Sequence, residues 1–233
     1  MDLNNTGIPL ASVSVDYDGE ARDPLTPDIG ADEFTPITTN DAEVLAILSP
    51  QPTVPFAAGV QDVVVEIKNN GADTLLQVNI DWTANGLPQL PYSWTGFLEP
   101  GERDTVTLGS FNFNLGFSNN LLVVSSQPNG QADNNTSNDT IQVQDLYPAL
   151  LGTYTIGGSF PDFPSFSAAA TSLNNGGILG PVTFQVRNGT YNEQLILGSI
   201  RGSGPANPIL FQAENGQSDF VHGQCIPLRR SWP

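Results

Sequence analysis

Short segments in which apolar and polar residues alternate recur between residues 42 and 146, and this pattern restricts that part of the chain to β-structure. In residues 60–69, Val63, Val65 and Ile67 alternate with polar side chains, so every second residue faces one side of a strand. Asn-Gly turn signals separate such segments. The pattern predicts seven strands, at residues 43–48, 60–69, 76–82, 90–97, 104–108, 121–125 and 140–144.

Strands at this spacing favour two antiparallel sheets packed face to face, a β-sandwich over residues 41–146. A core of this size can be stable by itself. Trp82 and Val65 are the residues that we most expect in it. The predicted fold class is therefore all-β.

The residues before the sandwich are too few to form a comparable domain. Residues 1–38 contain one alternating run, at 11–15, and a single strand cannot bury a face alone. We expect this piece to be the end of a longer domain, poorly packed or docked on the sandwich. A linker is predicted at residues 36–40.

Residues 147–221 combine one predicted helix with short strands. The helix is predicted over residues 164–175, with Ser165 as its cap and Phe166 and Leu173 on its apolar face. Strands are predicted at 182–186, 194–197 and 209–212. Short strands that recur and cannot bury their own faces indicate the first coils of a solenoid. We therefore expect the chain to be a slice of a longer protein.

The formal net charge is −17, and Lys68 is the only lysine. Such a surface repels phosphate groups, which argues against nucleic acid as a partner and against anionic membranes. No apolar run is long enough for membrane insertion. Scarce lysine and cysteine with abundant Asn and Thr favour an extracellular or cell-surface location, and we expect a monomer.

The only cysteine, Cys225, and the only histidine, His222, lie within the last twelve residues. A disulfide within the chain and a Cys/His zinc site are therefore excluded. Catalysis by a Ser-His-Asp or Cys-His arrangement would depend on this one histidine. We interpret residues 222–233 as a non-native tail, with an ordinary loop as the alternative. No cofactor is predicted apart from calcium.

Calcium is suggested by Asp16, Asp18, Glu20 and Asp23, which lie two or three residues apart in the sequence on either side of Gly19, where a tight turn is expected. Closely spaced carboxylates supply the oxygen ligands that calcium prefers, although the spacing fits an EF-hand loop only in part. The alternative is an Asp/Gly turn held by its own hydrogen bonds.

A second acidic, amide-rich loop lies between the last two predicted strands of the sandwich. It contains the sequences Asp133-Asn134-Asn135 and Asn138-Asp139. This loop too could hold calcium, and an ordinary hairpin-like connection is the alternative.

Aromatic residues in the fourth predicted strand suggest a platform for carbohydrate. Tyr92 and Trp94, with Trp82 and Phe97 near them in the sequence, could stack on the apolar faces of sugars. The alternative places Trp82 in the core and Trp94 over a sheet edge.

Three motifs in residues 41–146 resemble the bacterial cell-adhesion-related domain called CARDB, which is an immunoglobulin-like sandwich. They are a strand that ends in Lys-Asn-x-Gly, a Pro-Gly turn before a Thr-rich strand, and a closing Asp-Asn-x-x-x-Asn, here residues 63–71, 98–102 and 133–139. The resemblance implies a spacer or adhesion module of a secreted bacterial protein.

The flanking segments resemble right-handed parallel β-helix proteins. Asp-x-Asp-Gly-x-x-Arg at residues 16–22, followed by Asp-Ile-Gly-Ala-Asp-Glu at 28–33, is similar to the end of such a helix. The predicted capping helix and Asn-Gly-Thr-Tyr-x-Glu at residues 188–193 resemble the opening of a pectate-lyase-like domain. The catalytic residues of those enzymes lie several coils later, so the resemblance implies none here.

We therefore expect a non-enzymatic spacer or adhesion module of a large secreted or cell-surface bacterial protein. Its partner would be an extracellular polysaccharide or a cell-surface protein. One alternative is a fragment of a polysaccharide-degrading β-helix enzyme that lacks its catalytic coils. Another is a carbohydrate-binding module.

Overall fold

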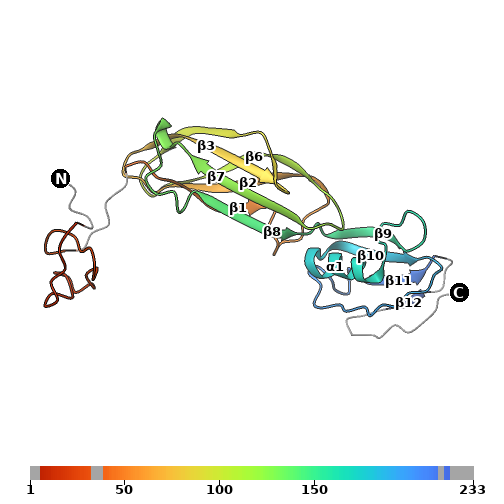
Figure 1. Cartoon of the computed structure of the whole chain (residues 1–233). Coiled ribbons are helices and arrows are strands. Elements are labelled where there is room, and N and C mark those ends of the chain that lie inside the picture. The colour runs from red at the N-terminus through yellow and green to blue at the C-terminus, as the bar shows by residue number, and fades with distance from the viewer. Residues whose placement is uncertain (1–5, 33–38, 215–217, 221–233) are drawn as a thin grey trace. The chain divides into compact units, whose positions relative to one another are not determined.

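The computed structural model describes residues 6–32, 39–214 and 218–220. The chain divides into two compact units, Met1–Thr39 and Asn40–Pro233. The second unit holds a β-sandwich and, later in the chain, a smaller sheet with a helix (Figure 1). The fold class is all-β, as the sequence predicts. No helix among the described residues has the length and hydrophobicity needed to cross a membrane.

Two antiparallel sheets make up the sandwich. The first has the order β1-β2-β6, formed by β1 (Ala42–Ser49), β2 (Gly59–Asn69) and β6 (Arg103–Phe113). The second sheet consists of β3 (Leu75–Ala84), β4 (Leu87–Pro88), β5 (Tyr92–Leu98), β7 (Asn119–Ser126) and β8 (Thr140–Leu146). Its strand order is β4-β3-β7-β8, and β5 also pairs with β3. All seven strands that the sequence predicts for the sandwich are present. The structure also contains β4, which the sequence analysis does not predict.

The core of the sandwich lies between the two sheets. Val63, Val65 and Ile67 of β2 are buried, while the residues between them are only partly buried. Trp82 is buried on the facing sheet. Both residues that the sequence places in the core, Val65 and Trp82, are therefore confirmed there.

One strand departs from simple alternation. The sequence predicts apolar residues of the third strand at even positions, including Leu76, but Leu75 is 1% exposed and Leu76 is 53% exposed. The pairing of β3 with β5 shifts register between Leu75 and Gln77. This irregularity reverses the side on which the first residue of the strand lies.

The smaller sheet follows the sandwich in the chain. Strands β9 (Leu150–Ile156), β10 (Ile178–Val186) and β11 (Ile209–Ala213) are parallel and adjacent in chain order, and β12 (Ser218–Phe220) adds an antiparallel edge. Helix α1 (Phe166–Gly176) is preceded by its N-cap residue Ser165, whose Oγ accepts a hydrogen bond from Ala168 N. The helix and its cap are confirmed.

The sequence analysis misses β9 and is wrong about a strand at residues 194–197. In that segment Leu195 forms a single bridge, and it is buried in a separate hydrophobic core that the smaller sheet and α1 share. Alternating apolar residues such as Leu195 and Leu197 can therefore anchor an extended loop to a core without forming a strand of a sheet.

The first unit contains no extended strand among its described residues, so the predicted strand at 11–15 is wrong. Val13 N donates to Leu10 O and closes a turn within that run. Val15 forms an isolated bridge with Ala21. The predicted tail, residues 222–233, lies outside the described residues, as do His222 and Cys225.

Candidate functional site

The acidic segment near the N-terminus folds into a tight loop. Asp16 N donates to Glu20 O (2.9 Å), and Glu20 N donates to Asp16 Oδ1 (2.7 Å). Gly19 has a φ of 91°, a conformation that residues with a Cβ rarely adopt. The Asp-x-Asp-Gly sequence thus produces a turn in which the first carboxylate holds the loop closed.

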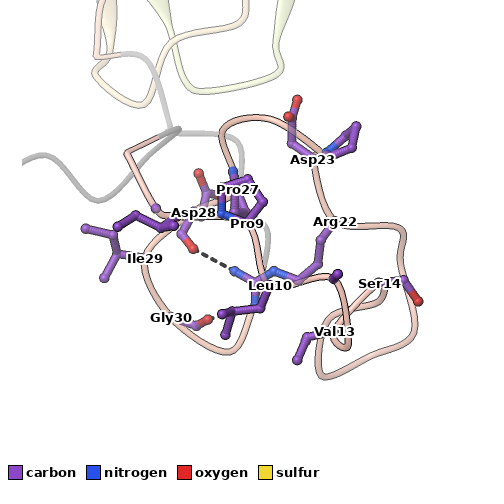
Figure 2. Close-up of a pocket in the computed structure, with 14 residues that line it drawn as sticks. Pro9, Leu10, Val13, Ser14, Arg22, Asp23, Pro27, Asp28, Ile29 and Gly30 are labelled. Carbon is purple, nitrogen blue, oxygen red and sulfur yellow. Dashed lines mark hydrogen bonds between the residues drawn. The ribbon is translucent and has the colours of Figure 1, made fainter.

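Arg22 joins this loop to the second acidic motif. Its Nη2 donates to Asp28 O (2.6 Å) and its Nη1 to Gly30 O (2.9 Å). Figure 2 shows the guanidinium group of Arg22 pointing at these backbone carbonyls. Tyr17 N donates to Ala31 O (2.8 Å), which fastens the residue before Asp32 beside the loop. These contacts hold the two motifs side by side.

The result is a cluster of three carboxylates, Asp16, Asp18 and Asp32. One oxygen of each lies within 4.8 Å of those of the other two. A hydrogen bond with Asp18 raises the pKa of Asp32 to about 6, and burial and the nearby charges act in the same direction. Such crowding of like charges can be relieved by a proton or by a cation.

The cluster contains only two of the four residues that the sequence suggests. Glu20 contributes its backbone N–H to the loop, and its carboxylate is not a member of the cluster. Asp23 Oδ1 accepts hydrogen bonds from Leu25 N (2.7 Å) and Thr26 N (2.8 Å), which lower the pKa of Asp23. Asp32, which sequence reasoning misses, takes their place, and calcium binding stays a prediction.

A pocket of about 480 Å³ lies next to this loop. Figure 2 shows Leu10, Val13 and Ile29 around it, together with Arg22 and Asp23. Its wall combines apolar side chains with backbone that the arginine holds in place. The sequence analysis does not predict this pocket.

The two aromatic candidates for carbohydrate binding lie in β5. Trp94 is 5% exposed and its Nε1 donates to Asp104 Oδ2 (2.8 Å). Its ring lies against Gly96, where an added Cβ would be 2.4 Å from Trp94 Cζ2. Tyr92 is partly buried against the same core. The ring of Trp94 is therefore a core element, and the exposed face that sugar stacking needs is absent at this residue.

Comparison with known proteins finds two similar solved structures. One is a solution structure of a domain from a Methanosarcina acetivorans protein provisionally described as a cell surface protein: 17% identical, covering 46% of this chain and 91% of that one, TM-score 0.39. The other is a crystal structure of a CARDB domain from Pyrococcus furiosus, in complex with di-metal ions: 19% identical, covering 47% and 96%, TM-score 0.37.

No protein-family model matches the chain, and no curated protein does. The likeness to the two solved structures concerns less than half of this chain. Neither of them is described as a β-helix protein, and the β-helix resemblance stays a prediction.

Proposed function

We propose that this chain is a non-enzymatic module of a secreted or cell-surface protein in which the sandwich serves as a spacer. This proposal rests on the two places at which the chain enters and leaves the sandwich. The chain enters the sandwich at Asp41 and leaves it at Leu146. These two residues lie at opposite ends of the sandwich. A domain with this geometry adds length between the segments that it connects.

Hydrogen bonds define the Asp41 end. Ser125 Oγ donates to Ala42 O (2.5 Å), and Ser125 N donates to Asp139 O (2.9 Å). The start of β1 therefore lies beside the start of β8, although the two strands belong to different sheets. Both strands run away from this end.

The Leu146 end lies at the other extreme of β8. Seven residues of β8 advance the chain by about 20 Å, because each residue of a strand adds about 3.4 Å. Leu146 pairs with Asn119 at the start of β7. Just beyond it, Ala149 N donates to Phe56 O (2.8 Å) in the loop after β1. The chain thus leaves the sandwich near the place where β1 ends.

Mechanical unfolding of the full chain tests the spacer proposal. Attachment cysteines replace Asn40 and Tyr147, and Cys225→Ser removes the natural thiol. Unfolding in one step should release about 340 Å, since residues 42–146 reach roughly 360 Å when extended and span about 20 Å when folded. Separation of the sheets in several weak steps would contradict a spacer, as would turnover of a polysaccharide by the chain.

The smaller sheet favours a second proposal, that β9, β10 and β11 begin a parallel β-helix. Phe184 is in register with Tyr154 of β9 and Phe211 of β11. The rings of Phe184 and Phe211 stack at 4.6 Å and 17°. Aligned side chains on successive parallel strands support a coil repeat. A parent protein with further coils could be a polysaccharide-degrading enzyme, and turnover by that parent but not by this chain would support this alternative.

A further inference from the structure

The loop between β7 and β8 brings acidic and amide side chains to the Asp41 end of the sandwich. Asp133, Asn138 and Asp139 come from this loop, and Asp41 directly precedes β1. Asn138 Nδ2 donates to Asp41 Oδ1 (2.9 Å), which joins the two segments. Sequence positions more than 90 residues apart thus meet at one place.

Neutral amide groups hold two of the carboxylates in position. Asp133 Oδ2 accepts from Ala42 N (3.0 Å), and Asp133 Oδ1 accepts from Asn135 N (2.8 Å). Asn135 Nδ2 donates to Asp41 Oδ2 (3.4 Å), in addition to the bond from Asn138. The arrangement is therefore anchored to the first strand of the sandwich and does not depend on the loop alone.

Two enclosed oxygen atoms beside these carboxylates have no hydrogen-bond donor. They are Asp139 Oδ1 and Asn138 Oδ1. Asp139 is 7% exposed, so water does not freely solvate its side chain. A buried acceptor without a partner is unfavourable, and a buried carboxylate more so, unless a positive group completes it.

The electrostatics of Asp139 agree with this geometry. Burial raises the pKa of Asp139 to about 6, and the charges of Asp133 and Asp41 add to the effect. At neutral pH the carboxyl group is still mainly ionised, since the ambient pH exceeds that pKa. Negative charge therefore accumulates around two oxygens that lack donors.

We propose that Asp133, Asn138 and Asp139 bind a divalent cation at the Asp41 end of the sandwich. Asp139 Oδ1 and Asn138 Oδ1 are the open ligand atoms, and Asp41 and Asp133 contribute negative charge. Carboxylate and amide oxygens on a loop suit Ca²⁺, which accepts six to eight such ligands in irregular geometry, better than Mg²⁺. A bound ion would link the β7–β8 loop to the residue that precedes β1.

Thermal unfolding of the full chain tests this site. Trp232→Phe removes the tryptophan outside the described residues, so that emission comes from Trp82 and Trp94 in the sandwich core. Unfolding is recorded near pH 7.5, first in EDTA and then in about 5 mM CaCl₂, above the dissociation constants of typical extracellular calcium modules. We expect calcium to raise the midpoint by about 5 °C or more, because the ion binds only the folded state.

Two substitutions separate this site from the carboxylate cluster of the first unit. Asp139→Asn should abolish the shift, because it removes the enclosed charge while keeping the shape of the side chain. The matched control, Asp18→Asn, changes the other acidic cluster and should retain the shift. Calcium bound per chain, measured by equilibrium dialysis, should fall by one ion in Asp139→Asn.

Two outcomes would overturn the proposal. One is a calcium-induced shift of the unfolding midpoint that persists at full size in Asp139→Asn. The other is a chain with Asp139 intact whose unfolding midpoint does not respond to calcium. If Asp139→Asn does not fold, Asp133→Asn takes its place and the same two outcomes decide.

Discussion

At the residue scale, a buried polar side chain gives the Lys-Asn-x-Gly motif a structural role. Asn69, in the Lys-Asn-x-Gly sequence that ends β2, is buried, and its Nδ2 donates to Asp73 O and to Leu98 O (both 2.9 Å). Its Oδ1 accepts from Gly71 N (3.0 Å). One amide thus holds its own turn and the end of β5.

Replacing Asn69 should therefore weaken the sandwich. Asn69→Ala removes three hydrogen bonds and leaves buried backbone groups unpaired, so the free energy of unfolding should fall by about 2–3 kcal/mol. Denaturant titration followed by tryptophan fluorescence measures this. Asn112→Ala, at an exposed position of β6, is the control and should change stability by less than about 0.5 kcal/mol.

The carboxylate cluster of the first unit yields a second prediction at this scale. In an Asp139→Asn background, calorimetric titration with calcium should show binding at Asp16, Asp18 and Asp32. Asp32→Asn should weaken this binding at least about tenfold, because it removes one of three charged ligands. Glu20→Gln should leave the affinity unchanged, since that carboxylate lies outside the cluster. Absence of heat at millimolar calcium would exclude the site.

At the element scale, loops beside a strand or a helix add hydrogen bonds to those within the element itself. After β9, Asp162 Oδ2 accepts hydrogen bonds from Thr155 N (2.8 Å) and Thr155 Oγ1 (2.7 Å). On the other side, Glu193 Oε2 accepts from Ser167 N (2.8 Å) in the first turn of α1. Carboxylates thus fix loops to both a strand and a helix.

Asp162 makes the stability of the smaller sheet depend on pH. The hydrogen bonds from Thr155 lower the pKa of Asp162 below its usual value. The unfolded chain therefore binds a proton more readily, and this contribution is present above about pH 4 and is lost as the pH falls through the lowered pKa. The protection factors of the amide hydrogens in β9, which correct for the intrinsic pH dependence of exchange, should fall there. Asp162→Asn should reduce that pH dependence, and an unchanged profile would contradict the assignment.

At the scale of the whole molecule, sequence reasoning is accurate where a feature depends on residues close together in the sequence. It fails where the feature depends on residues far apart in the sequence. The strands of the sandwich are predictable because alternation is local, as in β2. The register shift at Leu75 and the recruitment of Asp32 depend on pairing with distant segments, which no local pattern encodes. Strand β9 escapes prediction because Gly152 and exposed residues interrupt its alternation, leaving Leu150 and Ile156 as the buried positions at its two ends.

The division into two compact units leads to a prediction for the whole chain. Deleting residues 1–39 should leave the unfolding midpoint of the sandwich within about 2 °C of the intact chain, because domains with their own cores can fold alone. Differential scanning calorimetry measures this. A much larger loss would show that the first unit contributes to the stability of the second.

The placement of Asp41 and Leu146 at opposite ends of the sandwich also has a consequence for how such a protein could change over time. Duplicating the segment between them would lengthen the parent by one increment per copy, and neither neighbour would need to be rebuilt. Reach from a surface could then be adjusted by copy number alone, with no alteration to any binding residue.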